Sequence, residues 1–128
     1  MKDMALQYTA EGGNIRITDG GAPVLAIQEG LPYPGEKKVL IALAGVLRSD
    51  VTGYVENELR SFMSLGADIL VETQEVSYLS VAAQQCFLRA QQYADRIGRG
   101  TLTLHVPNET LYAQFAQTGI TELLQIAR

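Results

Sequence analysis

Cysteine, histidine and tryptophan are nearly absent from this 128-residue chain, which has one Cys, one His and no Trp. A single cysteine, Cys86, cannot form an intramolecular disulfide, so a disulfide-stapled secreted scaffold is excluded and a reducing, cytoplasmic setting is expected. An enzyme usually needs several convergent titratable groups, and one histidine with one cysteine supplies few of them. The composition therefore predicts a protein that is not an enzyme and that holds no metal or cofactor.

Long hydrophobic segments and clusters of basic residues are also missing. The longest apolar run, over residues 39–47, has nine residues, about half of the ~20 that a membrane-spanning helix needs. Residues 1–13 contain acids and no continuous apolar stretch, so we expect no signal peptide. The net charge is −4, and the ten basic residues are scattered along the chain. We therefore expect neither membrane insertion nor nucleic-acid binding.

The first part of the chain, residues 1–38, is rich in glycine, proline and polar residues. Its apolar pieces at 14–18 and 23–27 predict two short strands joined at a DGG turn. The segment 29–38, EGLPYPGEKK, predicts a surface loop, because prolines cannot donate to a strand ladder.

Strand and helix patterns alternate in the rest of the chain. The run 38–46 is apolar at odd and even positions alike, which predicts a central strand covered on both faces. The alternation predicts an α/β fold with a mostly parallel sheet in one domain, residues 1–128, with N-terminal strands and a loop over 1–38 and a core over 39–128. The first expected helix begins at Ser49 or Asp50 as N-cap and ends before Gly66. The other expected elements are a short strand at 67–72 with 76–79 leading to the next element, helices over 81–97 and after Asn108, a strand at 101–106, and a final helix or turn at 120–126.

Four titratable residues have structural explanations. His105 lies on the polar face of an alternating strand and is expected to be a surface or edge histidine. Cys86 lies on the apolar stripe of the helix over 81–97, which predicts that it packs as a small hydrophobic residue. Glu72 and Glu75 have no His or Cys at metal-ligand spacing, so we expect them to be solvated loop acids. An enzymatic alternative would require His105 to meet a glutamate or Cys86.

Ser80 stands where a predicted strand is followed by a helix, and its hydroxyl has two explanations. As an N-cap, the side-chain oxygen would accept a hydrogen bond from the backbone N–H of Ala82 or Ala83. As a modification site, it would carry a phosphate that the exposed amides and the helix dipole stabilise. Periodicity alone does not choose between the two.

Over residues 39–126 the chain resembles a STAS domain, the fold of bacterial anti-sigma factor antagonists. The similarity rests on VLIALAGVL with Gly45 and Leu47, a helix beginning around Asp50, ADILVETQEVSYLS, GTLTLHV and FAQTGITELLQI, in this order. The resemblance implies a mostly parallel or mixed sheet of four to six strands with helices packed largely on one side. It also implies a function through binding to a protein partner, either an anti-sigma factor or a related kinase-like regulator.

The residue that carries the family's switch is different in this chain. The family's partner phosphorylates a serine in an Asp-Ser-[Ser/Thr]-Gly motif at the start of the second helix, and the corresponding residues are Ser80, Val81, Ala82 and Ala83. Valine has no hydroxyl, so phosphorylation is not expected at Val81, and Ser80 is the remaining candidate. Arg48 stands where the family has an acid, so a partner selected for an acidic corner is expected to bind poorly.

The sequence therefore predicts a non-enzymatic, protein-binding regulatory module that is not phosphorylated at the usual serine position. The alternative is a sensor module of the same fold that binds a small ligand, such as a nucleotide or a lipid-related metabolite. The sequence leaves open whether residues 1–38 pair with the sheet edge or mediate a homodimer. The expected partner-binding surface comprises Arg48, Ser49, Ser80, Val81, Gln84 and Gln85.

Overall fold

A computed structural model describes residues 6–30 and 38–128. Its strands form one seven-stranded sheet, in which they lie side by side in the order of the sequence. The first four strands are antiparallel and the last four are parallel, so β4 belongs to both halves. The strands are β1 (Leu6–Glu11), β2 (Asn14–Asp19), β3 (Ala22–Gly30), β4 (Lys38–Leu47), β5 (Asp68–Leu79), β6 (Thr101–His105) and β7 (Gln125–Ala127). The helices are α1 (Thr52–Ser64), α2 (Val81–Ile97) and α3 (Glu109–Gln117), with 3-10 turns η1 (Ser49–Val51) and η2 (Ile120–Glu122).

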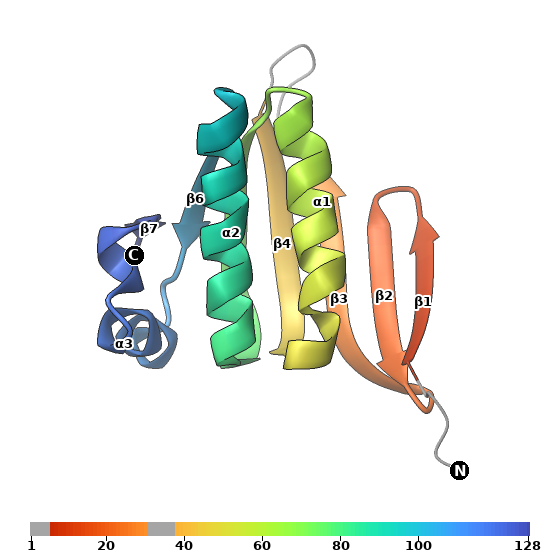
Figure 1. Cartoon of the computed structure of the whole chain (residues 1–128). Helices are drawn as coiled ribbons and strands as arrows, with labels where there is room; N and C mark the ends of the chain where they lie inside the picture. Colours follow the sequence, from red (N-terminus) through yellow and green to blue (C-terminus); the bar gives the residue numbers. More distant parts are fainter. Residues whose placement is uncertain (1–5, 31–37) are drawn as a thin grey trace.

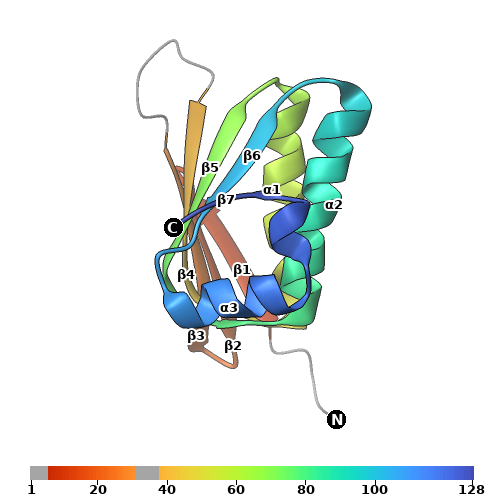
Figure 2. The same ribbon diagram turned by 90° about the vertical axis from the view of Figure 1, so that its left-hand side faces the viewer.

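The helices α1 and α2 lie side by side against one face of the sheet (Figure 1). In the view turned by 90°, both helices lie on one side of the strands, and no described helix covers the other face, which is called the bare face below (Figure 2). The mixed α/β fold with helices largely on one side is confirmed, but the sheet has seven strands instead of four to six. The two additional edge strands are β1 and β7. The strand β7 has only three residues and so carries a weak signal. The sequence LQYTAE of β1 alternates apolar and polar residues before Gly12 and Gly13, a hairpin signal that the prediction overlooked.

Two diglycine turns build the antiparallel half. Gly12 and Gly13 join β1 to β2 with φ values of 59° and 87°, and Gly20 and Gly21 join β2 to β3 with 61° and 88°. Two successive positive φ values define a type I′ turn, whose twist matches that of the flanking strands. The predicted DGG turn is thus confirmed, whereas most of the predicted loop at 29–38 lies outside the described residues.

The central strand β4 is covered on one face only, so the prediction of cover on both faces is wrong. Val39, Ile41 and Leu43 are buried beneath the helices, whereas Leu40 on the opposite face is 38% exposed. Both crossover helices, α1 and α2, lie on the same side of the sheet (Figure 2). An apolar sequence shows that a segment favours a strand, but it does not show on which face of the sheet the helices pack.

The strand β5 is longer than predicted. A short strand at 67–72 and a separate approach at 76–79 were expected, but Asp68–Leu79 is one continuous strand. Its polar middle, ETQE, hides this continuity, and its register against β4 shifts between Ala42 and Ala44 and between Gly45 and Val46.

The helix boundaries follow local signals unevenly. The helix over 81–97 and the N-cap at Asn108, whose side chain accepts from the N–H groups of Thr110 and Leu111, are confirmed. Neither Ser49 nor Asp50 caps α1 through its side chain, because both belong to η1, which precedes that helix. The segment 120–126 contains the turn η2 and most of the strand β7 instead of a single helix or turn.

Candidate partner-binding site

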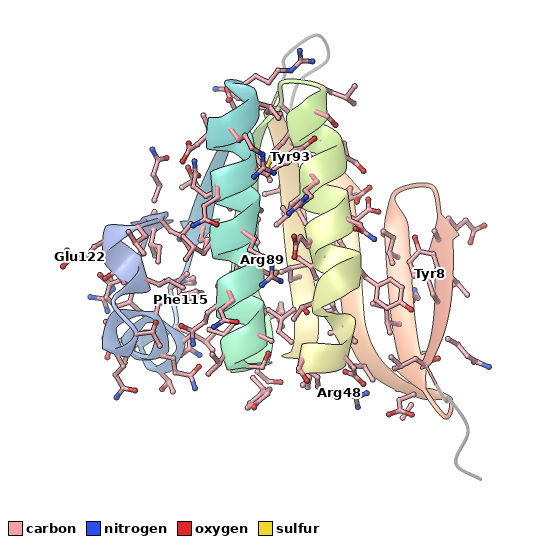
Figure 3. The ribbon with its side chains drawn as sticks, in the orientation of Figure 1. Tyr8, Arg48, Arg89, Tyr93, Phe115 and Glu122 are labelled. Carbon is pink, nitrogen blue, oxygen red and sulfur yellow. The ribbon has the colours of Figure 1, made fainter. Side chains whose placement is uncertain are left out.

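The C-terminal ends of β4 and β5 bring the predicted site together. The backbone N–H of Ser80 donates to the carbonyl oxygen of Leu47 at 3.0 Å, so the residues after β4 lie beside the start of α2. Arg48 lies at this end of the molecule, where α1 begins (Figure 3). Val81 is the first residue of α2, and its side chain is 60% exposed.

Ser80 is the N-cap of α2. Its Oγ accepts a hydrogen bond from the backbone N–H of Ala83 at 3.1 Å, and the residue is only 9% exposed. The cap satisfies one of the free N–H groups in the first turn of the helix. The hydroxyl is therefore already used in stabilising the helix.

Replacing Ser80 by alanine should lower the free energy of unfolding by about 1 kcal/mol, because the N–H of Ala83 loses its side-chain acceptor and keeps only the carbonyl oxygen of residue 80. Chemical denaturation of the wild type and of Ser80→Ala measures this difference. Ser77→Ala is a control in a neighbouring exposed residue that caps no helix, and it should change stability less. Equal losses in the two variants would contradict the capping role.

Gln84 links the start of α2 to the end of α3. Its side chain is 3% exposed, and its Oε1 accepts a hydrogen bond from Thr118 Oγ1 at 2.7 Å. Of the six predicted surface residues, Ser80 and Gln84 are thus buried, whereas Ser49, Val81 and Gln85 are exposed and Arg48 is partly exposed.

Tyr78 is an exposed residue of this region that the sequence analysis did not select. It pairs in register with Val46 and is 51% exposed, whereas Val76 and Leu79 of the same strand are buried. Strict alternation would place Tyr78 on the buried side with Val76, but Ser77 and Tyr78 are both exposed between buried Val76 and Leu79, where the register against β4 shifts. The local pattern therefore contained no signal for this exposure. Tyr78 and Val81 are two large side chains, three positions apart, that are both more than half exposed.

Two carboxylates neutralise the arginine of the site. Arg48 donates hydrogen bonds to Asp50 at 2.7 Å and to Asp19, at the end of β2, at 3.0 Å. The hydrogen bonds from Arg48 hold the pKa of Asp50 below its usual value. One guanidinium beside two carboxylates leaves no local excess of positive charge, so the charge reversal expected from Arg48 is offset by its neighbours.

The remaining titratable candidates lie elsewhere. Cys86 is 1% exposed, and burial raises its pKa to about 12, so it stays a thiol and its predicted packing role is confirmed. His105 is not at an edge, since β7 pairs beyond β6, but its side chain is 34% exposed. Its Nδ1 lies 2.6 Å from Glu72 Oε1, which is the contact with a glutamate that the enzymatic alternative requires. Glu72 and Glu75 are strand residues of β5, which corrects their prediction as loop acids. Within residues 6–30 and 38–128 there is no group of three metal-binding side chains and no helix that could cross a membrane.

A carboxyl pair lies between β3 and α1. Burial, together with the neighbouring carboxyl of Glu58, raises the pKa of Glu29 to about 8. Glu29 Oε2 is buried and has no hydrogen-bond partner among the described residues. The folded protein therefore binds the Glu29 proton more tightly than the unfolded chain does.

The stability of the protein should fall as the pH rises from about 4.5, the ordinary pKa of the group, through about 8, because unfolding releases the Glu29 proton in this range. Glu29 is only partly buried, so after screening by solvent we expect this group to contribute on the order of 1 kcal/mol. Denaturation at several pH values should show the fall in the wild type and a smaller fall in Glu29→Gln. The exposed control Glu75→Gln should keep the wild-type profile, and a full fall in Glu29→Gln would contradict the assignment.

The bare face of the sheet is hollowed at the end opposite the site. A hollow of about 340 Å³ is mostly apolar and within the size range of small-ligand sites. It is open to solvent and does not include the start of α2. Its lining residues are Lys38, Val39, Leu40, Asp68, Ile69, Leu70, Thr101 and Thr103.

Several solved structures share this architecture. The Bacillus cell fate determinant SpoIIAA, in its phosphorylated form, aligns with a TM-score of 0.59 at 16% identity, over 80% of this chain and 91% of that chain. A Thermotoga maritima protein assigned as an anti-sigma factor antagonist aligns with a TM-score of 0.67 at 12% identity, over 80% and 86% of the two chains. An anti-sigma factor antagonist from Mycobacterium paratuberculosis aligns with a TM-score of 0.64 at 8% identity, over 80% and 85%.

No family model and no curated protein matches the chain. The likeness to the solved structures lies at 8–16% identity and concerns the fold. The fold of this chain is therefore that of the anti-sigma factor antagonists, a STAS-like α/β fold.

Proposed function

We propose that this protein is a non-enzymatic regulatory module that binds a protein partner, in the manner of an anti-sigma factor antagonist. The observation that carries the proposal is the exposure of Val81, 60%, at the first position of α2. An apolar side chain held outward at a helix start contributes roughly 1.5–3 kcal/mol when a partner buries it. The partner is an anti-sigma factor or a related kinase-like regulator.

The contact surface consists of the exposed residues around Val81. Tyr78 adds an aromatic side chain, a residue type enriched at the centre of interfaces. Ser49 and Gln85 supply hydrogen-bonding groups at the rim. Arg48 supplies a charged group whose position is held by its ion pairs with Asp19 and Asp50. Ser80 and Gln84 are buried and hold the start of α2 in place beneath this surface.

Binding is not controlled by phosphorylation at the start of α2. Val81 offers no hydroxyl. Ser80 is 9% exposed as a residue, and its hydroxyl oxygen accepts the cap hydrogen bond from the N–H of Ala83. Intact-mass analysis of the protein from its native host should show no phosphate at this segment. A phosphate that Ser80→Ala removes would overturn this part of the proposal.

The decisive variant is Val81→Asp, tested by affinity capture from native lysate with quantification of each captured protein. The change places a negative charge in the apolar contact, so Val81→Asp should no longer capture a protein that the wild type captures. The variant should fold at least as well as the wild type, because a carboxylate in the first turn of a helix is favourable. A melting curve of the purified variant checks this point.

Leu65→Asp is the matched control, since Leu65 is also a large exposed apolar residue, 69% exposed, but follows the far end of α1. A partner retained by Leu65→Asp and lost in Val81→Asp supports the surface. Equal capture by Val81→Asp and by the wild type contradicts it.

A second candidate function, binding of a small ligand, has one observation in its favour: the apolar hollow of about 340 Å³ on the bare face. A nucleotide or a lipid-related metabolite in this hollow would raise the melting temperature of the wild type. Leu70→Glu, which places a charge in the hollow, should abolish that rise. A ligand screen without any stabilising compound would remove this candidate.

A further inference from the structure

The strand β1 forms an open edge of the sheet. It pairs with β2 through six consecutive residue pairs without a register shift. No other described strand pairs with its outer side, since β1 is the first strand of the sheet order. Figure 1 shows the β1–β2 hairpin extending beyond α1, with no helix in front of it. An edge of this kind offers backbone donors and acceptors to another strand.

The turn geometry identifies which backbone groups point outward. Gly12 and Gly13 form a two-residue turn, so the flanking residues Glu11 and Asn14 exchange hydrogen bonds. In an antiparallel pair, hydrogen-bonded and non-bonded positions alternate. The next residue, Ala10, lies opposite Ile15 at a non-bonded position, so its N–H and C=O face the open edge, and the same holds for Tyr8.

The edge lacks the features that protect edge strands in monomeric proteins. Such strands are kept short or carry lysine, proline or a bulge. The opposite edge strand, β7, has only three residues. By contrast, β1 has six residues with no proline and no lysine, and its one charge is Glu11 at the end.

An aromatic stack holds β1 in position. The rings of Tyr8 and Tyr54, from α1, lie 5.1 Å apart with an interplanar angle of 17°, and Figure 3 shows Tyr8 directed from β1 toward the helix. Tyr8 remains 45% exposed. Leu6, Tyr8 and Ala10 share the helix side of the strand, so the open edge presents an apolar strip beside its free backbone groups.

We propose that two copies of this chain associate through β1, paired antiparallel about a two-fold axis near Tyr8 and Thr9. In this arrangement the two sheets become one, and the two apolar strips lie against each other. The two Glu11 side chains lie at opposite ends of the paired strands, whereas parallel pairing would place them side by side. A two-fold contact of this kind uses a different part of the molecule from Val81, so it leaves the proposed partner surface free.

The test is the mass of the full-length protein in solution, measured by sedimentation equilibrium over a range of concentrations. The wild type should approach twice its chain mass of 13.9 kDa. Ala10→Pro removes an outward N–H and should raise the dissociation constant about tenfold or more. Ala10→Thr keeps this N–H in a residue that favours strands and should stay dimeric.

Hydrogen exchange on the wild type gives an independent measurement, should Ala10→Pro fail to fold. The amides of Tyr8 and Ala10 should exchange more slowly as the protein concentration rises. If the wild type has a mass of 13.9 kDa at every concentration, the proposal is overturned. The same mass would be measured if β1 paired with a strand of another protein and not with a second copy, so that case also contradicts the proposal. A dimer in which the Ala10 amide stays unprotected, or that Ala10→Thr disrupts as strongly as Ala10→Pro, also overturns it.

Discussion

Gly45→Ala is expected to lower the free energy of unfolding by about 3 kcal/mol or more. Gly45 has φ 119°, a backbone conformation that residues with a side chain rarely adopt. A Cβ at this position would overlap the carbonyl oxygen of Val24 in the neighbouring strand β3. The variant therefore has two costs: the steric overlap of the added Cβ with the backbone of β3, and a φ value that is unfavourable for alanine. Urea denaturation, read as a shift of the midpoint at unchanged slope, measures the loss.

Gly53→Ala is the matched control for this prediction. Gly53 lies in α1, and a Cβ there would meet nothing within 4 Å. Alanine is favoured over glycine in a helix, so this variant should gain about 0.5–1 kcal/mol. A tolerated Gly45→Ala would show that β3 and β4 can separate at this point.

Phe87→Ala should cost about 3–5 kcal/mol, the range found when a fully buried aromatic residue leaves a cavity. Phe87 is 0% exposed and lies on the inner face of α2. Its ring centroid lies 6.4 Å from that of Phe115 on α3, with the rings tilted by 48°. This pair fastens α3 to α2, and Gln84 and Thr118 join the same two elements. Calorimetry or chemical denaturation measures the effect.

A double-mutant cycle with Phe115→Ala separates the ring contact from general packing. The two side chains touch, so the losses should not add, with a coupling of about 0.5–1.5 kcal/mol for the aromatic pair. Leu123→Ala serves as control, because Leu123 is a large apolar residue near α3 that is 60% exposed. It should change stability by no more than about 0.5 kcal/mol. Additive losses for Phe87 and Phe115 would contradict a direct contact.

Elements with strong local signals were predictable from the sequence. The helix α2 begins at Val81 and ends at Ile97 as expected, because Ser80 supplies a cap at one end and Gly98 adopts a left-handed conformation at the other. Asn108 marks the start of α3 in the same way. In each case the deciding interaction joins residues at most four positions apart, so it is visible in a short stretch of sequence.

Elements that depend on distant contacts were missed. The short strand β7 exists because β6, 22 positions away between Thr103 and Gln125, offers it hydrogen-bonding partners. The strand β1 is a different case, since its alternating sequence and the Gly12–Gly13 turn are local signals that the prediction overlooked. The polar middle of β5 stays in the sheet because β4 pairs along most of its length and Thr73 donates to the carbonyl oxygen of His105. Whether a segment forms a strand depends more on the neighbouring strands than on the intrinsic strand propensity of its residues.

The candidate site shows the same division. The sequence by itself determined that Val81 stands at the first position of a capped helix without a hydroxyl, because a cap and a side chain's chemistry are local properties. Only the tertiary structure decided that Gln84 is buried against Thr118 and that Asp19 meets Arg48, 29 positions away. It also decided which face of the sheet stays bare and which edge stays open. Burial and charge pairing depend on which segments the fold brings together, and the chain's local pattern does not contain that information.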